Sequence, residues 1–294
     1  MMSNLESLTS NLDLDPHSPI TISIRTTHAD NALRQKLEWF LQQPGIDWLV
    51  ENSKSGGVYP KLTITRRGVF LNDGLENLHF HPSMALLRLM NRFRGHSDRY
   101  LLATGLIPGD TLLDLTMGLG TDALVGAWAV GKQGRVTGVE CSPVLSALVN
   151  DGLQSLFTAS MPKSENAAKQ LAWEALSLVA GRIKVICADH LDFLGQQPSA
   201  SVEVIYFDPM FRYPSQKSAS IKPLHSWSDH QSLRLEVIRE ARRVARRCIV
   251  LKERKGSSEF TRLGFDILSG GKYSQVDYGL IRCSMFDGRC SNAE

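Results

Sequence analysis

The sequence predicts an α/β fold, a doubly wound and mostly parallel seven-stranded sheet that finishes in an antiparallel C-terminal hairpin. After residue 110, short apolar segments rich in valine, isoleucine and leucine alternate with helical segments. Strands that alternate with helices form parallel sheets covered by helices on both faces. The five expected parallel strands are Leu112–Leu115, Arg135–Val139, Ile183–Cys187, Val202–Phe207 and Cys248–Lys252. The expected intervening helices are Asp122–Val130, Val144–Leu156, Ala167–Val179 and Ser232–Arg246.

The end of the chain departs from this alternation. Phe265–Leu268 and Val276–Arg282 have strand patterns and flank the turn Gly270–Gly271 without a long helix between them. Two strands joined by a short glycine-containing connection indicate an antiparallel hairpin.

The first 110 residues do not show this regular alternation of strands and helices. We expect a small α+β domain over residues 1–80, a helical connector over residues 81–110 and the main domain over residues 111–294. The elements expected before the main domain are strands Thr21–Arg25 and Val58–Thr65 and helices Ala29–Gln43, Met84–Arg94 and Ser97–Thr104.

The composition is that of a folded globular protein. Hydrophobic residues make up 43% of the 294 residues, charged residues 21%, and the net charge is +3. The five cysteines form no CxxC pair, and Cys141, Cys187 and Cys248 are expected in the core as reduced thiols. His79 and His81 have no further ligand cluster, so no metal site is expected. With a polar N-terminus and no apolar run of about 18 residues, we expect a soluble cytoplasmic protein.

A glycine turn directly follows the first strand of the main domain. In Asp114-Leu-Thr116-Met-Gly118-Leu-Gly120, two glycines let the backbone turn tightly and approach a ligand. The next helix is expected to begin with Asp122 as its N-cap. The spacing from Gly118 to Ala123 also fits a dinucleotide fingerprint, so the turn alone leaves NAD open.

Acidic residues at the ends of four successive strands indicate whether the turn binds NAD or a different cofactor. Glu140 is placed to accept hydrogen bonds from ribose hydroxyls, and Asp189 from an adenine amino group. Asp114, beneath the glycine turn, repels a pyrophosphate but suits the cationic amino group of S-adenosylmethionine (SAM). The set, completed by Asp208, favours SAM over NAD.

The segment Asp208-Pro209-Met210-Phe211 is the expected catalytic element. A carboxylate and a backbone carbonyl at this turn can accept hydrogen bonds from an exocyclic base amine and aim its lone pair at a methyl group. Phe211 would stack on a flipped base. The alternative is a structural turn with a core phenylalanine.

These motifs resemble the bacterial small-subunit ribosomal RNA guanine-N2 methyltransferases of the RsmJ (YhiQ) type, which are class I SAM-dependent methyltransferases with a Rossmann-like fold. The resemblance covers roughly the stretch from Asp114 to Lys252. The matching residues are Asp114, Thr116, Gly118, Leu119, Gly120, Asp122 and Ala123, then Asp208–Phe211, then Gln216, Lys217, Ser218, Ala219 and Lys222, and finally Lys252.

The resemblance implies cofactor contacts at four places and an RNA substrate. The implied cofactor contacts are Thr121–Asp122, Glu140–Cys141, Asp189–His190 and Asp208, although Thr121 stands where the family usually has arginine. The candidate substrate contacts, which follow strand ends, are Lys217, Lys222, Lys252 and Arg254.

A basic run from Arg234 to Lys255 is either a phosphate-facing patch or a solvated helix face. The function that these features predict is RNA base N-methylation, most specifically at guanine N2. The alternatives are a methyltransferase for a small molecule or a protein side chain, a non-catalytic SAM- or RNA-binding module, and an NAD-linked enzyme.

Overall fold

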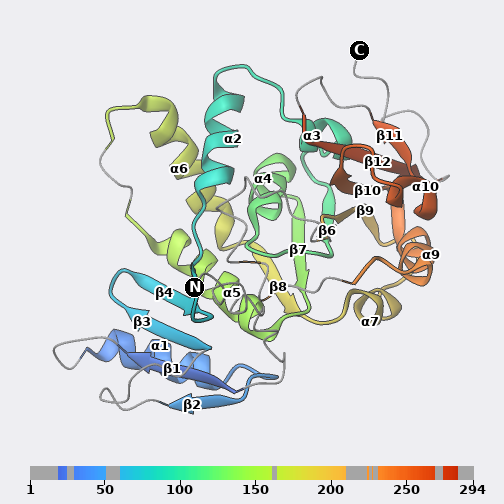
Figure 1. Cartoon of the computed structure of the whole chain (residues 1–294). Helices are drawn as coiled ribbons and strands as arrows, with labels where there is room; N and C mark the ends of the chain where they lie inside the picture. The colour runs from blue at the N-terminus through green and yellow to red at the C-terminus, as the bar shows by residue number, and fades with distance from the viewer. Residues whose placement is uncertain are drawn as a thin grey trace, which may run out of the picture. The chain divides into compact units, whose positions relative to one another are not determined.

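The computed structural model describes residues 19–24, 30–50, 60–160, 164–209, 224, 227, 231–268 and 274–283. The chain divides into two compact units, one with the described residues up to His79 together with Leu224 and Trp227, and one with the other described residues from Phe80 on (Figure 1).

The first unit is built on a five-stranded sheet within the described residues, in the order β2-β1-β3-β4-β5. Its strands are β1 (Ile20–Ile24), β2 (Trp48–Val50), β3 (Lys61–Thr65), β4 (Gly68–Asn72) and β5 (Asn77–Leu78). Strand β1 pairs in parallel with β2 and β3, whereas β3-β4-β5 is an antiparallel meander. Helix α1 (Asn31–Leu41) begins after Asp30, whose carboxylate accepts hydrogen bonds from the backbone N–H groups of Ala32 and Leu33.

The second unit contains the predicted α/β sheet, and the fold prediction is confirmed. Within the described residues its seven strands have the order β11-β12-β10-β9-β6-β7-β8. The strands are β6 (Thr111–Asp114), β7 (Arg135–Glu140), β8 (Ile183–Cys187), β9 (Val202–Phe207), β10 (Ala245–Arg254), β11 (Asp266–Leu268) and β12 (Val276–Arg282). Strands β6 to β10 are mutually parallel, and β12 pairs antiparallel with both β10 and β11.

The helices of this unit cover both faces of the sheet (Figure 1). Their bounds are α2 (Ser83–Phe93), α3 (Arg99–Thr104), α4 (Thr121–Val130), α5 (Pro143–Thr158), α6 (Ala167–Ala180), α7 (His190–Gly195), α9 (Leu235–Val244) and α10 (Glu259–Leu263). Helices α2 to α6 contribute to one apolar cluster, and α7, α9 and α10 to the other. The helices α2 and α3, expected as a connector, are therefore part of the core of this unit.

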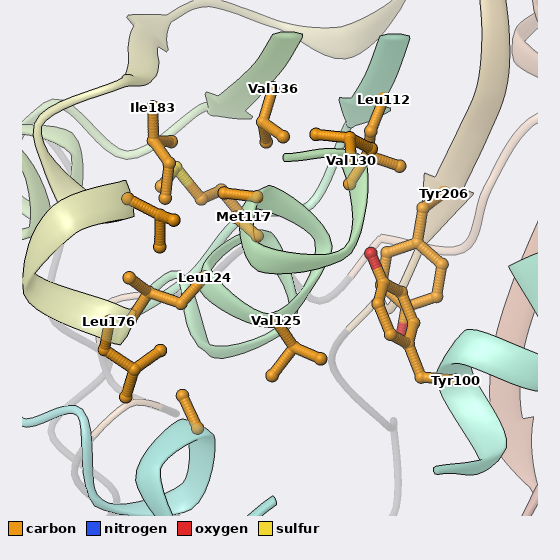
Figure 2. Packing of buried hydrophobic residues seen from close by; sticks show 14 of the residues in the cluster. Tyr100, Leu112, Met117, Leu124, Val125, Val130, Val136, Leu176, Ile183 and Tyr206 are labelled. Carbon is orange, nitrogen blue, oxygen red and sulfur yellow. The ribbon is translucent and has the colours of Figure 1, made fainter. Parts of the chain in front are cut away.

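The first cluster packs around α4, as Figure 2 shows. Leu124 and Val125 of this helix are fully buried, because its sequence is apolar on nearly every side. Tyr100 and Tyr206 meet edge to face with ring centroids 4.8 Å apart. This cluster supports the carboxyl edge of β6 and β9, where the sequence places its candidate site.

One local expectation was wrong, and one helix was missed. Cys187 is exposed because β8 is an edge strand, whereas Cys248, on the interior strand β10, is buried as expected. Helix α7 was not predicted, because its six residues are too few to show a clear helical period. Among the described residues, no helix is long and apolar enough to cross a membrane.

Candidate functional site

The glycine turn after β6 is fastened to both neighbouring strands. Leu115 donates its backbone N–H to the carbonyl of Tyr206 on β9 (3.0 Å), and Met117 donates to that of Val139 on β7 (3.0 Å). Gly120 closes the turn by donating to the carbonyl of Met117 (2.8 Å). The loop therefore continues the sheet and has a fixed position at its carboxyl edge.

Both glycines of the turn have left-handed backbone conformations, which would be strained in a residue that carries a side chain. Their φ angles are +51° at Gly118 and +74° at Gly120. Gly120 is the N-cap of α4, and the prediction that Asp122 caps this helix was wrong. Asp122 lies one residue inside the helix start, because a left-handed glycine already turns the chain into α4.

The Met117 side chain packs between the glycine turn and strand β7. A Cβ at Gly138 on β7 would lie 2.1 Å from Met117 Sδ, and a Cβ at Gly120 would lie 3.0 Å from Met117 Cε. The Met117 side chain therefore occupies space that two glycines leave open.

Glu140 joins the end of β7 to the glycine turn. Its Oε2 accepts a hydrogen bond from the backbone N–H of Gly118 (2.9 Å), and its Oε1 from that of Ser142 (2.9 Å). The Cys141 thiol lies 3.7 Å from Oε1. Glu140 is buried, so these bonds hold its carboxylate and the turn in one arrangement.

Asp189 and His190 lie at the start of α7, beyond the end of β8. Asp189 Oδ1 accepts hydrogen bonds from the backbone N–H groups of Leu191 (2.8 Å) and Asp192 (3.2 Å), which makes it the N-cap. The His190 ring meets Phe207 edge to face at 6.4 Å between centroids. The capping bonds fix the direction of the Asp189 carboxylate at the cofactor edge.

Asp208 follows β9 and is tied to the glycine turn. Its backbone N–H donates to Thr116 Oγ1 (2.5 Å), and its Oδ2 accepts from Lys252 Nζ (2.6 Å). Pro209 is the next residue, and Met210 and Phe211 lie outside the described residues. The glycine turn after β6 and the expected catalytic element after β9 are thus in direct contact.

Asp122 is the centre of a buried ion network. Its Oδ1 accepts from Arg88 of α2 (2.5 Å), and its Oδ2 accepts from the Tyr206 hydroxyl (2.9 Å) and from Lys252 Nζ (3.3 Å). Lys252 therefore connects two carboxylates, Asp122 and Asp208. This lysine was expected to contact substrate, and the structure places its ammonium group between two acidic side chains of the protein itself.

Arg88 continues the network into the helices before the sheet. Its guanidinium binds Asp98 in a bidentate manner (2.7 and 2.9 Å), and Asp98 also caps α3 by accepting from the Leu101 backbone N–H. Sequence reasoning missed both residues, because an arginine and an aspartate in helical segments carry no local sign that they meet.

Electrostatics within the network favour the charged forms of Asp122 and Lys252 but not that of Asp208. Burial by itself would raise the pKa of Asp122, but Lys252 and Arg88 outweigh it and hold that pKa well below its usual range. Burial works against charge on Lys252 as well, yet Asp122 and Asp208 raise its pKa. Burial also raises the pKa of Asp208, although Lys252 opposes this effect. Asp122 and Asp208 therefore favour the charged form of Lys252 beside the catalytic candidate.

Asp114 differs from these acids. It is 1% exposed, and its Oδ1 accepts one hydrogen bond from the Thr116 backbone N–H (3.2 Å). Burial, with the negative charge of Asp122 adding to it, raises the pKa of Asp114 well above its usual range. An anionic Asp114 would gain from a nearby cation, which the amino group of SAM can supply.

The basic residues between Arg234 and Lys255 divide between the amino edge and the carboxyl edge of the sheet. Arg246 and Arg247 lie at the start of β10, and Arg247 binds Asp110 just before β6 (3.0 and 2.6 Å). Arg243 donates to the backbone carbonyls of Gln197 and Leu194. These three arginines hold the amino edge of the sheet together, away from the glycine turn.

Arg254 and Lys255 lie at the other end of β10, on the side of the glycine turn. Arg254 is exposed, and its backbone N–H donates to Glu253 Oε1 (2.6 Å). Lys217 and Lys222, the other two candidate substrate contacts, lie outside the described residues. No group of three potential metal ligands occurs among the residues that the structure describes.

The sheet order, the glycine turn and the acids at the strand ends fit the nucleoside and amino groups of SAM. They define a SAM-dependent methyltransferase. The chain belongs to the family described as "Putative SAM-dependent methyltransferase", whose model matches residues 90–260. The prediction of SAM as the cofactor is confirmed, and the NAD alternative was wrong.

Relatives of known sequence support the same family. The chain is 34% identical over 251 residues to "Uncharacterized protein YpiP" of Bacillus subtilis, a match over 85% of this chain and 88% of that one. It is 36% identical over 146 residues to "Ribosomal RNA small subunit methyltransferase J" of Laribacter hongkongensis, over 48% of this chain and 45% of that protein. The second match thus spans less than half of that relative, and the resemblance to this family is confirmed.

Among solved structures, the chain is similar to TrmN from Thermus thermophilus. The TM-score is 0.41 at 16% identity, with 90% of this chain and 71% of that chain covered.

Proposed function

We propose that this methyltransferase transfers the methyl group of SAM to an exocyclic base amine of structured RNA, specifically to N2 of a guanine in small-subunit ribosomal RNA. The observation that carries the proposal is the contact between the cofactor turn and Asp208. The Asp208 backbone N–H donates to Thr116 Oγ1, so the carboxylate that would orient the amine is fixed to the loop that would hold the methyl donor.

The cofactor roles follow from the positions of the acids. Glu140 would accept from the ribose hydroxyls, Asp189 would face the adenine amino group, and Asp114 would pair with the amino group of the methionine part. The backbone of Gly118–Gly120, with Thr121 at the first position of α4, would line the turn beside the cofactor. SAM supplies a methyl group bonded to a positively charged sulfur.

Asp208 would act by positioning and by accepting a proton. Its carboxylate and the backbone carbonyl of Pro209 can accept hydrogen bonds from the two N–H groups of an exocyclic amine, which aims the nitrogen lone pair at the methyl carbon. Bound SAM would supply the methyl group and become a neutral thioether, and the methylated nitrogen would give up one proton to Asp208. Lys252, held at 2.6 Å, keeps that carboxylate in place.

The relative named as a ribosomal RNA small-subunit methyltransferase supports RNA as the substrate class. The basic residues that could meet phosphates are those on the side of the site, Arg254 and Lys255, together with Lys217 and Lys222 from the sequence. Arg243, Arg246 and Arg247 are excluded from this role, because their guanidinium groups bind acids and carbonyls at the amino edge.

The test uses methyl-labelled SAM with small-subunit ribosomal RNA transcribed in vitro, followed by nuclease digestion and mass spectrometry of the nucleosides. We expect labelled N2-methylguanosine, and a loss of about two orders of magnitude or more in rate for Asp208→Ala with a much smaller change in RNA affinity. A protein that binds SAM but labels no RNA would instead act on a small molecule or a protein side chain, or be non-catalytic.

Salt dependence tests the phosphate contacts separately. Log affinity for the RNA should fall linearly with log salt by about 0.7–0.9 for each contact. Charge reversal at Arg254 and Lys255, or at Lys217 and Lys222, should flatten the slope by about two units. Arg239→Glu, an exposed change in the middle of α9, is the matched control. An equal effect of the control would contradict the assignment of contacts to the site edge.

A further inference from the structure

A cavity of about 330 Å³ lies at the carboxyl edge of β9 and β10, next to Pro209. Its apolar part includes Leu233, Leu251 and Leu263, and its polar part includes Glu253 and Ser257. Sites for small organic groups begin at about 300 Å³ and combine apolar walls with a few polar groups. The cofactor set does not use this cavity, so it is available to a second ligand.

The pairing of the strands places the cavity beside the catalytic candidate. Leu251 on β10 is the register partner of Phe207 on β9, and both side chains belong to the same apolar cluster. Because side chains alternate along a strand, Glu253 faces the same side as Leu251, and Lys252 faces the other side, where it binds Asp208. Glu253 is thus one residue from the cation that holds Asp208.

The charge of Asp208 also reaches Glu253. Burial raises the pKa of Glu253, and the negative charges of Glu259 and Asp208 add to the effect. The side chain is half-buried, and its Oε1 accepts a hydrogen bond from the Arg254 backbone N–H (2.6 Å). This bond orients the carboxylate in a partly apolar cavity.

A carboxylate in such a cavity discriminates between bases by their hydrogen-bonding edges. Guanine presents two adjacent donors, N1–H and the N2 amine, and a carboxylate is an acceptor with two oxygens. Adenine and cytosine each present a ring nitrogen that is an acceptor next to their amine, so a carboxylate meets one of their acceptors with another acceptor. A site built to pair with a donor rejects a base that lacks it.

We propose that this cavity receives the target base and that Glu253 is the specificity-determining residue that selects guanine through its N1–H donor, next to the N2 amine that the Asp208-Pro209 turn would bind. This inference rests on the proposed function, because it takes RNA as the substrate. Leu251 and Leu263 would contact the faces or edges of the base, and the N2 amine would lie between the Glu253 carboxylate and the Asp208-Pro209 turn.

The first test needs no variant. A ribosomal RNA fragment that contains the methylated nucleotide is prepared with either guanosine or 2-aminopurine riboside at that position. Both carry the amine at C2, but 2-aminopurine lacks the N1–H donor. We expect kcat/KM with the wild-type protein to be about ten- to a hundred-fold lower for the 2-aminopurine fragment, the range for one lost base contact. Equal values would overturn the inference.

The second test changes the protein. Glu253→Gln replaces one acceptor by a donor, so it should lower kcat/KM for the guanosine fragment about ten- to a hundred-fold and remove most of the discrimination against 2-aminopurine. SAM affinity should not change. The matched control is Glu259→Gln, which also lines the cavity but binds Arg262, and which should keep the discrimination.

The outcomes separate this inference from the proposed function. If the wild-type protein methylates guanine in RNA while Glu253→Gln keeps full discrimination, the inference fails and the function stands. If the wild-type protein methylates adenine or cytosine, guanine selection by Glu253 is wrong although RNA remains the substrate. If no RNA is methylated, both fail.

Discussion

Lys252 Nζ lies 2.6 Å from Asp208 Oδ2 and 3.3 Å from Asp122 Oδ2, so one partly buried ammonium group holds the acid after β9 and the acid at the start of α4. Both carboxylates are on the same side of the sheet as Tyr206. Lys252 thereby holds helix α4, which carries Asp122, close to Asp208, the catalytic candidate. This relationship makes the ion network a part of the site and not of the surface.

Replacing Lys252 by methionine should destabilise the fold and abolish most activity. The variant leaves the two acids without their shared cation, and breaking a buried pair in this way costs about 3–5 kcal/mol. Urea unfolding measures the loss, and methyl transfer at a temperature where the variant is folded measures activity. Lys255→Met, an exposed change at the first residue after β10, should change stability by less than about 0.5 kcal/mol. Similar values for both variants would contradict the role of Lys252.

Arg88 should matter to the site although it lies in a helix before the sheet. Arg88→Met removes the partner of both Asp98 and Asp122, with an expected loss of about 3–5 kcal/mol in unfolding free energy. The control on the same helix is Arg92→Met, whose guanidinium binds the His96 carbonyl at the surface.

A double-mutant cycle with Lys252→Met should show that Arg88 and Lys252 are coupled. Both contact Asp122, and residues of one network interact by about 0.5–3 kcal/mol. Strict additivity of the two changes would show that the network does not act as a unit.

Asp114→Asn should have opposite effects on stability and on cofactor binding. Because burial raises the pKa of Asp114, the folded state holds its proton more tightly than the unfolded state. The unfolding free energy contributed by this group is therefore greatest below the unfolded pKa and falls as the pH rises toward the folded pKa. At neutral pH the variant should be more stable by about 1 kcal/mol or more without cofactor, because the cost of ionising a buried acid is gone.

The same variant should bind SAM more weakly by about 1–3 kcal/mol, the value of a lost charge-assisted hydrogen bond. Urea unfolding at pH 7 and near pH 3 provides an internal control, because the stability difference should vanish where Asp114 is protonated in both states. A variant that is less stable at pH 7 but binds SAM normally would contradict both arguments.

Gly138→Ala should disturb the glycine turn from a distance. The new Cβ would lie 2.1 Å from Met117 Sδ, so Met117 and the turn above it must shift. We expect a loss of about 1–3 kcal/mol in stability and a weaker affinity for S-adenosylhomocysteine, measured by calorimetry. Gly195→Ala is the control, because a Cβ there has no atom within 4 Å. Unchanged affinity in Gly138→Ala would show that Met117 does not anchor the turn.

In the N-terminal unit, local sequence patterns predicted only some of the strands. Strands β1 and β3 were expected, but β2, β4 and β5 were not. Two of these have only two or three residues, too short for an alternation to be recognised. Pairing with a longer neighbour, and not their own sequence, makes them strands.

The sequence by itself determined the α/β alternation, the terminal hairpin, the glycine turn and the acids that end β6, β7, β8 and β9. These features are local, because apolar periodicity and turn chemistry depend on residues a few positions apart. Only the tertiary structure decided which charges meet. Arg88 reaches Asp122 across 34 residues, and Lys252 reaches it across 130, which no local pattern encodes. The basic residues lie close together in the sequence but are divided in space, because β10 runs from the amino edge to the carboxyl edge of the sheet and carries Arg247 to one edge and Arg254 to the other.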